Sequence, residues 1–238
     1  MGCVTFNGIQ SQDLHIQVEA PPEYETPERD YDVQHVPGRN GDIVQDNGSY
    51  KNVDRPYKIA IGSFDETYTV MANRISKWLH AKSGYGRLED SYEPDYYRLG
   101  MYLESGSIEN LFEHAGRTTI KFNCKPQRFL KSGEVTQILT TNRTLVNPTD
   151  FVALPIITVK GTGNGVLHVG ASIVTITNII NYITLNCEIG DAYNGLINLN
   201  SYIVLSNKEF PKLVPGDNAI SFSGGITSVE VTPNWWTI

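Results

Sequence analysis

Short runs of alternating apolar and polar residues, separated by turn residues, recur through most of the sequence and constrain its fold. After Glu134 they follow one another at short spacing, and none shows a helical period. Strict alternation puts one set of side chains on a buried face and the other set in solvent, as in a half-buried β-strand. Many such strands in close succession are typical of an all-β sandwich. The runs are GVLHVG, SIVTIT, YITLNCEI, GLINLN, YIVLSN, NAISFSG and SVEVTP.

One segment has a different period. Its apolar side chains recur at helical spacing and predict one amphipathic α-helix over about 66–81. Ser63 or Asp65 is placed to cap its start, and Gly84 lies just past its end. The stripe is typical of a helix that packs on a sheet, and a cofactor site is the less favoured interpretation. The stripe comprises Val70, Met71, Arg74, Ile75, Trp78 and Leu79.

The composition changes near Lys131-Ser132-Gly133. Of the 19 Lys/Arg and 26 Asp/Glu residues, only 4 and 7 lie in 134–238. That part is rich in Ile, Val, Thr, Asn and Gly, whereas the first part carries most of the charge and the predicted helix. We therefore predict a mainly β protein with two domains, 1–133 and 134–238.

Charge and cysteine content exclude several classes of protein. The net charge of −7 argues against binding nucleic acid by phosphate neutralisation. The three cysteines are far apart, so neither a disulfide framework nor a zinc site is expected. No run of eighteen apolar residues predicts a membrane span, and MGCVTFNGI lacks the features of a signal peptide. We expect no membrane insertion and synthesis in a cytoplasm.

No catalytic constellation stands out. The glycines of KGTGNGV (160–166) precede a strand and not a helix, so we interpret them as a hairpin turn and not as a phosphate-binding loop. The carboxylates of Glu89, Asp90, Glu93 and Asp95 fit a solvated turn better than acid/base chemistry. The five histidines share no ligand spacing. We predict that the protein is not an enzyme and has no catalytic, cofactor or metal site.

The stretch VPGRNGDIVQDNGSYKN contains three turn dipeptides. Pro37-Gly38 and Asn40-Gly41 stand back to back around Arg39 and predict a loop. Asn47-Gly48 predicts a tight turn between two strands, because glycine adopts positive φ at low cost. A surface hairpin is the simplest interpretation of this stretch.

The order of several motifs resembles the distal tail protein family of long-tailed, non-contractile bacteriophages. Each motif is weak alone, and the resemblance rests on their order over nearly the whole chain. In sequence they are VPGRNGD, LEDSYEPDYYR, FNCKPQR, and the ending that runs from GDNAI to NWW.

The resemblance implies a fold and a function. The first domain would be a β-sandwich-like fold with one helix, and the second a galectin-like β-sandwich. Six copies would form a ring in the virion, through strand pairing and a protruding hairpin. The ring would join the tail tube protein to the tip proteins, and DNA would pass through its centre without specific binding. Many relatives hold receptor-binding proteins with a long arm inserted in the second domain. The second domain here has no room for such an arm, so direct binding of receptor-binding proteins is left undecided.

Within this resemblance, the loop of the stretch described above becomes a candidate subunit interface. Its glycines would allow a neighbouring chain to approach closely, and Arg39 would donate to a carboxylate or to carbonyls of that chain. The predicted interface residues are Val36, Pro37, Gly38, Arg39, Asn40, Gly41, Asp42 and Ile43.

A carbohydrate-binding, lectin-like module of the tail tip remains the alternative function. It is less favoured because the second part has few basic groups and its adjacent tryptophans, Trp235 and Trp236, lie in the last residues and not in an alternating strand. Two adjacent tryptophans are rarely left exposed, so we expect the ending PNWWTI to fold back on the first domain.

Overall fold

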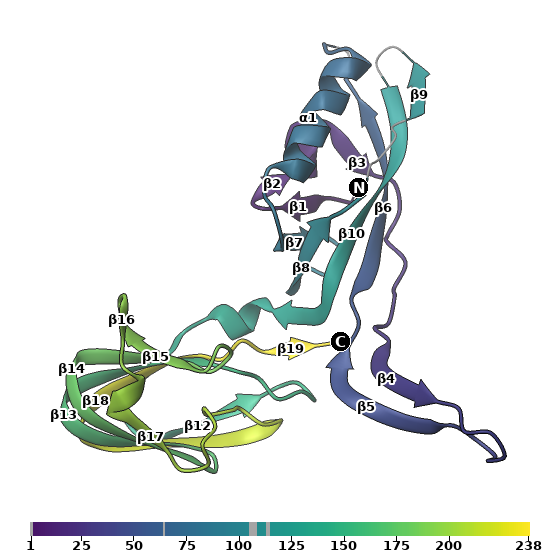
Figure 1. The fold of residues 1–238 in the computed structure, drawn as a ribbon. Helices are drawn as coiled ribbons and strands as arrows, with labels where there is room; N and C mark the ends of the chain where they lie inside the picture. Colours follow the sequence, from purple (N-terminus) through teal and green to yellow (C-terminus); the bar gives the residue numbers. More distant parts are fainter. Residues whose placement is uncertain (1, 64, 105–108, 113–114) are drawn as a thin grey trace. The chain divides into compact units, whose positions relative to one another are not determined.

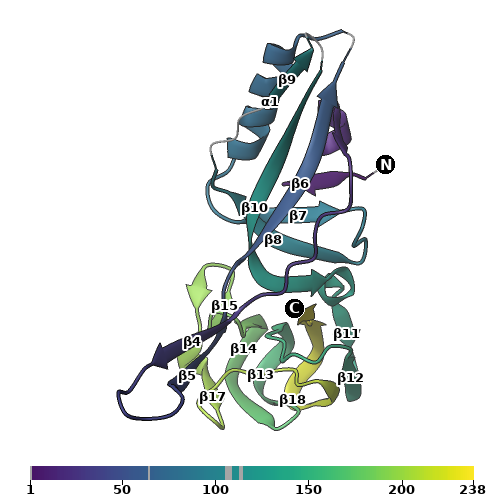
Figure 2. The same ribbon diagram turned by 90° about the vertical axis from the view of Figure 1, so that its right-hand side faces the viewer.

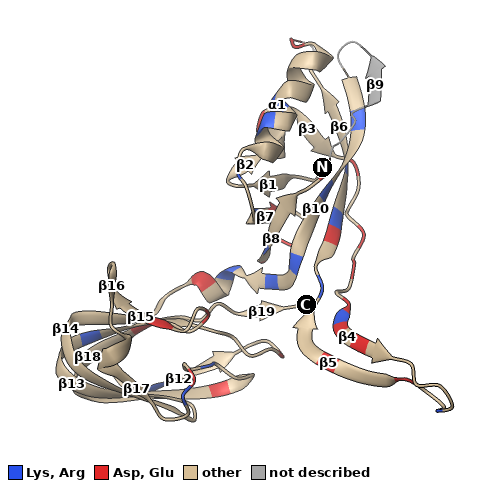
Figure 3. Cartoon of the chain, viewed as in Figure 1, with Lys and Arg blue, Asp and Glu red and all other residues tan. Residues whose placement is uncertain are grey.

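The chain is mainly β with one α-helix in its described part, as the sequence predicts. This computed structural model describes every residue except 1, 64, 105–108 and 113–114 (Figure 1). It forms two compact units, the first of residues 1–128 with residue 238 and the second of 129–237. Charged side chains are concentrated in the first unit (Figure 3). Each unit has its own hydrophobic core and is described separately.

The first unit is built on eight strands of a nine-stranded sheet, whose ninth strand, β19, belongs to the second unit. The strands follow the order β2-β1-β7-β8-β10-β6-β3, and β9 and β19 both pair with β10. Neighbouring strands β1 and β7, β7 and β8, β10 and β6, and β6 and β3 are antiparallel. The bounds are β1 Val4–Phe6, β2 Ile9–Gln10, β3 Ile16–Val18, β6 Val53–Gly62, β7 Gly86–Asp90, β8 Tyr96–Tyr102, β9 Glu109–Phe112, β10 Ala115–Leu130 and β19 Trp236–Thr237.

Helix α1, Tyr68–His80, covers one face of this sheet (Figures 1 and 2). The predicted helix is confirmed, but two details differ. Thr67 occupies the N-cap position instead of Ser63 or Asp65, and its carbonyl accepts from the next turn. Val70 points to solvent, because the stripe that faces the sheet is narrower than predicted. Its buried members are Met71, Ile75, Trp78 and Leu79.

Aromatic side chains fill the core between α1 and the sheet. The Trp78 indole donates to the carbonyl of Phe6 at 3.2 Å, and the two rings meet edge to face with centroids 6.3 Å apart. The ring of Phe6 also lies 4.8 Å from that of Phe122 on β10. Edge-to-face and tilted contacts of this kind stabilise aromatic pairs beyond the area they bury.

The second unit is made of long antiparallel strands. Strand β13 pairs with β14 on one side and with β18 on the other over most of its length. Shorter strands flank this central trio. The bounds are β11 Gln137–Leu139, β12 Arg143–Asn147, β13 Ile156–Val169, β14 Ser172–Asn186, β15 Asp191–Asn194, β16 Ile197–Asn198, β17 Ile203–Leu205 and β18 Gly216–Thr232.

Each long strand belongs to two layers. One half of β18 pairs with β11 and the other half with β12. In the same way, one half of β14 pairs with β15 and the other half with β17. The long strands bend together, as Figure 1 shows, and fold one continuous sheet over on itself. The alternating side chains that point inward from both layers form the core of the sandwich.

Glycines make the bend. The register of β13 against β18 shifts between Lys160 and Gly165, where the two backbones come very close. A Cβ atom on Gly161 would overlap the carbonyl of Gly225, and one on Gly225 would overlap the carbonyl of Thr162. The predicted hairpin turn at KGTGNGV is therefore wrong: strand β13 continues through these glycines as a bulge.

The terminal tryptophans belong to the second unit. Trp235 is 6% exposed and lies in the core of that unit. Trp236 donates from its indole to the carbonyl of Val152 at 2.9 Å, and its ring lies 4.5 Å from that of Phe151. The expectation that the ending PNWWTI folds back on the first domain is wrong for the two tryptophans, because the segment from Leu130 to Gly133 holds them within the second unit. Ile238 does group with the first unit, and its carbonyl accepts from Arg128 at 3.0 Å.

Candidate functional site

The predicted interface residues lie in a hairpin that extends away from the main sheet of the first unit. Strands β4, Arg29–Gln34, and β5, Ile43–Tyr50, form a separate two-stranded sheet (Figures 1 and 2). The loop between them holds Val36 to Asp42, and Ile43 begins β5. All of these residues are exposed except Val36, which is half-buried. The structure thus brings the predicted residues together at the tip of the hairpin.

The tip glycines have a conformational role. Gly38 and Gly41 have φ values of +82° and +81°, a region that other residues rarely adopt. Apart from each glycine and its two chain neighbours, no heavy atom of the described residues lies within 4 Å of the place where its Cβ atom would be. Arg39 makes no ion pair within the described part of the chain. The tip is therefore shaped by its glycines and presents one unpaired guanidinium to the solvent.

The hairpin has one apolar face. Val33 and Val44 are directly opposite each other, and Tyr31 precedes Val33 by two residues, so the three side chains share a face. They are 62%, 58% and 45% exposed. The other face carries Asp32 and Gln45, which are also paired across the strands. Two-stranded hairpins are marginally stable alone, so this apolar face needs a partner surface.

A bulge replaces the predicted turn at Asn47-Gly48. Strand β5 runs through these residues, and its register against β4 shifts between Arg29 and Tyr31. The amide of Gly48 donates to Asp46 Oδ1 at 2.8 Å, and Arg29 donates to Asp46 Oδ2 at 2.6 and 2.9 Å. These bonds from Arg29 and then Gly48 lower the pKa of the Asp46 carboxyl. The prediction failed because a single glycine with positive φ suits a bulge as well as a turn.

In addition to the hairpin, the first unit contains a buried group of charged residues, here called the arginine cluster. Its members are Arg55, Asp90, Glu93, Arg98 and Arg128. Arg55 on β6 lies 3.3 Å from Asp90 and 3.1 Å from Glu93, measured from Nη2 to the carboxylate oxygens. Glu93 is also 2.6 Å from Arg128 and 3.4 Å from Arg98. The side chains of Arg55, Asp90 and Arg98 are all less than a tenth exposed.

The arginine cluster explains the acidic segment LEDSYEPDYYR. Asp90 and Glu93 were interpreted as part of a solvated turn, which is wrong for these two: Asp90 is 4% exposed and Glu93 18%. The hydroxyl of Tyr57 donates to Asp90 at 2.7 Å, and burial, then the Asp90 charge, raise the Tyr57 pKa well above its usual value. Carboxylates engaged in this way hold the neighbouring arginine side chains in place.

The arginine cluster also holds the connector that leads into the hairpin. Arg55 Nη1 donates to the carbonyl of Glu23 at 3.3 Å, and the Arg128 guanidinium lies 5.1 Å from the ring centre of Tyr24. Where the connector meets β4, Lys51 pairs with Glu28 through both its ammonium group, at 3.0 Å, and its backbone amide, at 2.8 Å. These contacts fix the base from which the hairpin extends.

Sites of other kinds find little support. No group of three His, Cys, Asp or Glu side chains could hold a metal ion among the residues the structure describes. Cys124 and Cys187 are buried, and burial raises the pKa of each thiol to about 12, so neither is a reactive nucleophile. No helix in the described part of the chain is long and apolar enough to cross a bilayer.

Comparison with known proteins gives similarity at the level of structure. No protein-family model matches the chain, and no curated protein sequence is similar to it. Among solved structures, the chain is similar to the crystal structure of the SPP1 Dit (gp 19.1) protein, with a TM-score of 0.75 and 15% identity. The match covers 97% of this chain and 98% of that one. SPP1 Dit is described as a paradigm of the hub adsorption apparatus of phages that infect Gram-positive bacteria, and this chain shares its fold over both units.

Proposed function

We propose that the protein is a structural hub of a bacteriophage tail tip, located in the virion. Six copies form a ring that joins the tail tube protein to the tip proteins, and DNA passes through the centre of the ring. The protein has no catalytic role in this function. The proposal is supported by the fold shared with SPP1 Dit, which extends over both units and not over one common domain.

The exposed apolar face of the β4–β5 hairpin carries the proposal. Tyr31, Val33 and Val44 are largely exposed in the described part of the first unit, and the hairpin forms a sheet of its own, separate from the nine-stranded sheet. A second copy of the chain is the occupant that a ring requires, because each subunit then gives its hairpin to one neighbour and receives one from the other. Lasting interfaces of this kind bury on the order of 2,000 Å².

The charge of the chain supports a role as a DNA conduit. A net charge of −7 does not favour phosphate binding, so DNA can move past without being retained. The face of the hairpin opposite Val33 carries Asp30 and Asp32 and adds to this acidic character. A ring that threads DNA works best with such a surface.

The second unit provides a platform for other tail proteins. Residues 129–237 are described throughout, and they contain the strands of the sandwich with short connections and no inserted arm. Receptor-binding proteins that attach to the second unit would therefore contact the sandwich itself and not an arm. The resemblance implies a galectin-like second domain that points outward from the ring, which would make this β-sandwich accessible to other tail proteins.

The solution mass tests the proposed function directly. We expect light scattering after size-exclusion chromatography to give six times the mass of the chain, and negative-stain images to show rings with a central hole. Tail tube protein is added in a second run, because a partner can drive assembly of a weak ring. A protein that stays monomeric in both runs, at high concentration, contradicts the proposal.

A further inference from the structure

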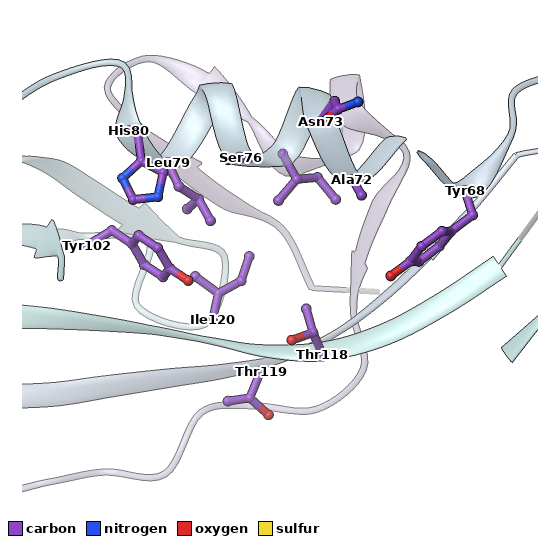
Figure 4. Close-up of a pocket in the computed structure, with 11 residues that line it drawn as sticks. Tyr68, Ala72, Asn73, Ser76, Leu79, His80, Tyr102, Thr118, Thr119 and Ile120 are labelled. Carbon is purple, nitrogen blue, oxygen red and sulfur yellow. The ribbon is translucent and has the colours of Figure 1, made fainter. Parts of the chain in front are cut away.

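A cavity of about 270 Å³ lies between helix α1 and the sheet face that the helix covers (Figure 4). Its inner wall is apolar and is formed by Ile75 and Leu79 from the helix and Ile120 from β10. This volume lies just below the roughly 300–1,000 Å³ of sites for drug-sized ligands. The cavity therefore suits a ligand with a single ring.

The remaining lining is polar but uncharged. Asn73 and Ser76 line the cavity from the helix, and Thr118 lines it from β10, whereas the Thr119 side chain points to the other face of the strand. No Lys, Arg, Asp or Glu is among the lining residues. Amide and hydroxyl groups both donate and accept hydrogen bonds, so this lining suits a neutral ligand that does the same.

Aromatic rings stand at the two ends of the cavity. Figure 4 shows Tyr68 at one end and Tyr102 with His80 at the other. The rings of Tyr102 and His80 meet edge to face with centroids 5.2 Å apart, which fixes the orientation of both. The ends therefore offer flat apolar surfaces, and the space between them offers hydrogen-bonding groups.

We propose that this cavity binds one neutral sugar residue of a glycan. A pyranose ring has a flat apolar face for the aromatic side chains and hydroxyls that donate and accept at once. A charged ligand is disfavoured because no lining residue neutralises it. An apolar side chain of a partner protein is disfavoured because it would strip water from Asn73 and Ser76 without replacing those hydrogen bonds.

This site differs from the lectin-like alternative suggested by the sequence, which placed a sugar site in the second part of the chain. It lies wholly in the first unit, and its lining residues come from α1, β8 and β10. The inference does not depend on ring assembly, because one chain supplies every lining residue. Sugar binding and ring assembly are therefore measured separately: a monomer that binds sugar would contradict only the ring, and a ring that binds no sugar would contradict only the sugar site.

The test uses the full chain and saturation-transfer NMR with glucose, galactose, N-acetylglucosamine and rhamnose, each up to about 20 mM. We expect at least one sugar to receive saturation, with a dissociation constant in the millimolar range. Ser76→Tyr fills the cavity, and binding should weaken about tenfold or more. Thr69→Tyr places the same ring on an exposed position of α1 outside the lining and should change binding less than twofold.

Thermal melts followed by circular dichroism show whether both variants remain folded. If Ser76→Tyr does not fold, Asn73→Ala replaces it as the variant that changes the cavity lining. Three results overturn the proposal. One is no saturation transfer to any of the four sugars. The second is equal weakening by Thr69→Tyr. The third is that a tail protein, and none of the sugars, protects the amides of α1 from hydrogen exchange in the unchanged chain.

Discussion

The arginine cluster and the β4–β5 hairpin lie in the same unit and use their side chains in opposite ways. In the cluster, Arg55 and Asp90 are almost fully buried, and each meets an opposite charge within the chain. In the hairpin, Val33 and Val44 are more than half exposed, and the Arg39 side chain makes no ion pair in the described part of the chain. Interactions completed within one chain stabilise the fold, whereas those left incomplete are available for assembly.

The largest effect is expected from Asp90→Ala. This change leaves Arg55 buried beside a single shared carboxylate, and breaking a buried ion pair costs about 3–5 kcal/mol of unfolding free energy. Chemical denaturation measures the loss. Asp95→Ala is the matched control, because Asp95 lies in the same turn but is exposed, and it should change stability by less than about 0.5 kcal/mol. Equal effects of the two changes would show that burial of the cluster has no energetic role.

A second test replaces the apolar pair of the hairpin. The double variant Val33→Ser with Val44→Ser should weaken assembly by about 2–3 kcal/mol per contact, because two valine side chains no longer leave water. Sedimentation velocity across a concentration series reports the shift toward monomer. Asp32→Ser with Gln45→Ser alters the neighbouring pair on the other face and should leave assembly unchanged. Rings from the valine variant as stable as those of the unchanged chain would rule out this face as the interface.

Arg39 gives a smaller and more specific effect. Arg39→Ala should weaken assembly by a few kcal/mol per contact where the neighbour's carboxylate is buried, and by less than about 1 kcal/mol where the contact is wet. The unfolding free energy of the monomer should not change, because Arg39 has no ion pair in the described part of the chain. Replacing Gly38 or Gly41 is a poorer test, since their positive φ would strain any larger residue within a single chain.

The smallest effect concerns pH at the base of the hairpin. Arg29 and Gly48 lower the pKa of Asp46, so the stability that this carboxylate contributes is present above its unfolded pKa and is lost as pH falls through the lower folded value. Carboxyl NMR titration should show Asp46 titrating below its usual value of 3.8. Arg29→Gln should move its midpoint upward. An unchanged midpoint in that variant would mean that the backbone amide of Gly48 alone sets the shift.

The sequence predicted elements best where one local pattern decides the outcome. The spacing of Met71, Ile75 and Trp78 fits an α-helix and not a strand. Both ends of the observed α1 lie within two residues of the predicted bounds. Alternation likewise predicted the strands of the second unit. The alternating pattern wrongly divided each of β14 and β18 into two strands. Asn178, Asn181 and Gly225 are residue types common in turns, but here they lie where a continuous strand bends.

The arginine cluster was missed because its members are far apart in the sequence. One local signal was present: in the alternating run from Val53 to Ile61, Arg55 occupies a position that faces inward, between Val53 and Tyr57. An arginine on a buried face needs carboxylates, and the acidic segment at Asp90 and Glu93 was available to supply them. The hairpin tip was located correctly, but the apolar face that makes it a candidate interface depends on the register of β4 against β5, which no local pattern specifies.

The bend in β13, β14 and β18 has a mechanical consequence. Because three covalent backbones cross from one layer to the other at that end, the two layers cannot be peeled apart there by breaking non-covalent contacts alone. The connection between β11 and β12 also lies at the bend, opposite residues 221–228 of β18, so opening must begin at the other end of the sandwich. Under mechanical load, such a sandwich would open in one direction only and stay closed along the bend.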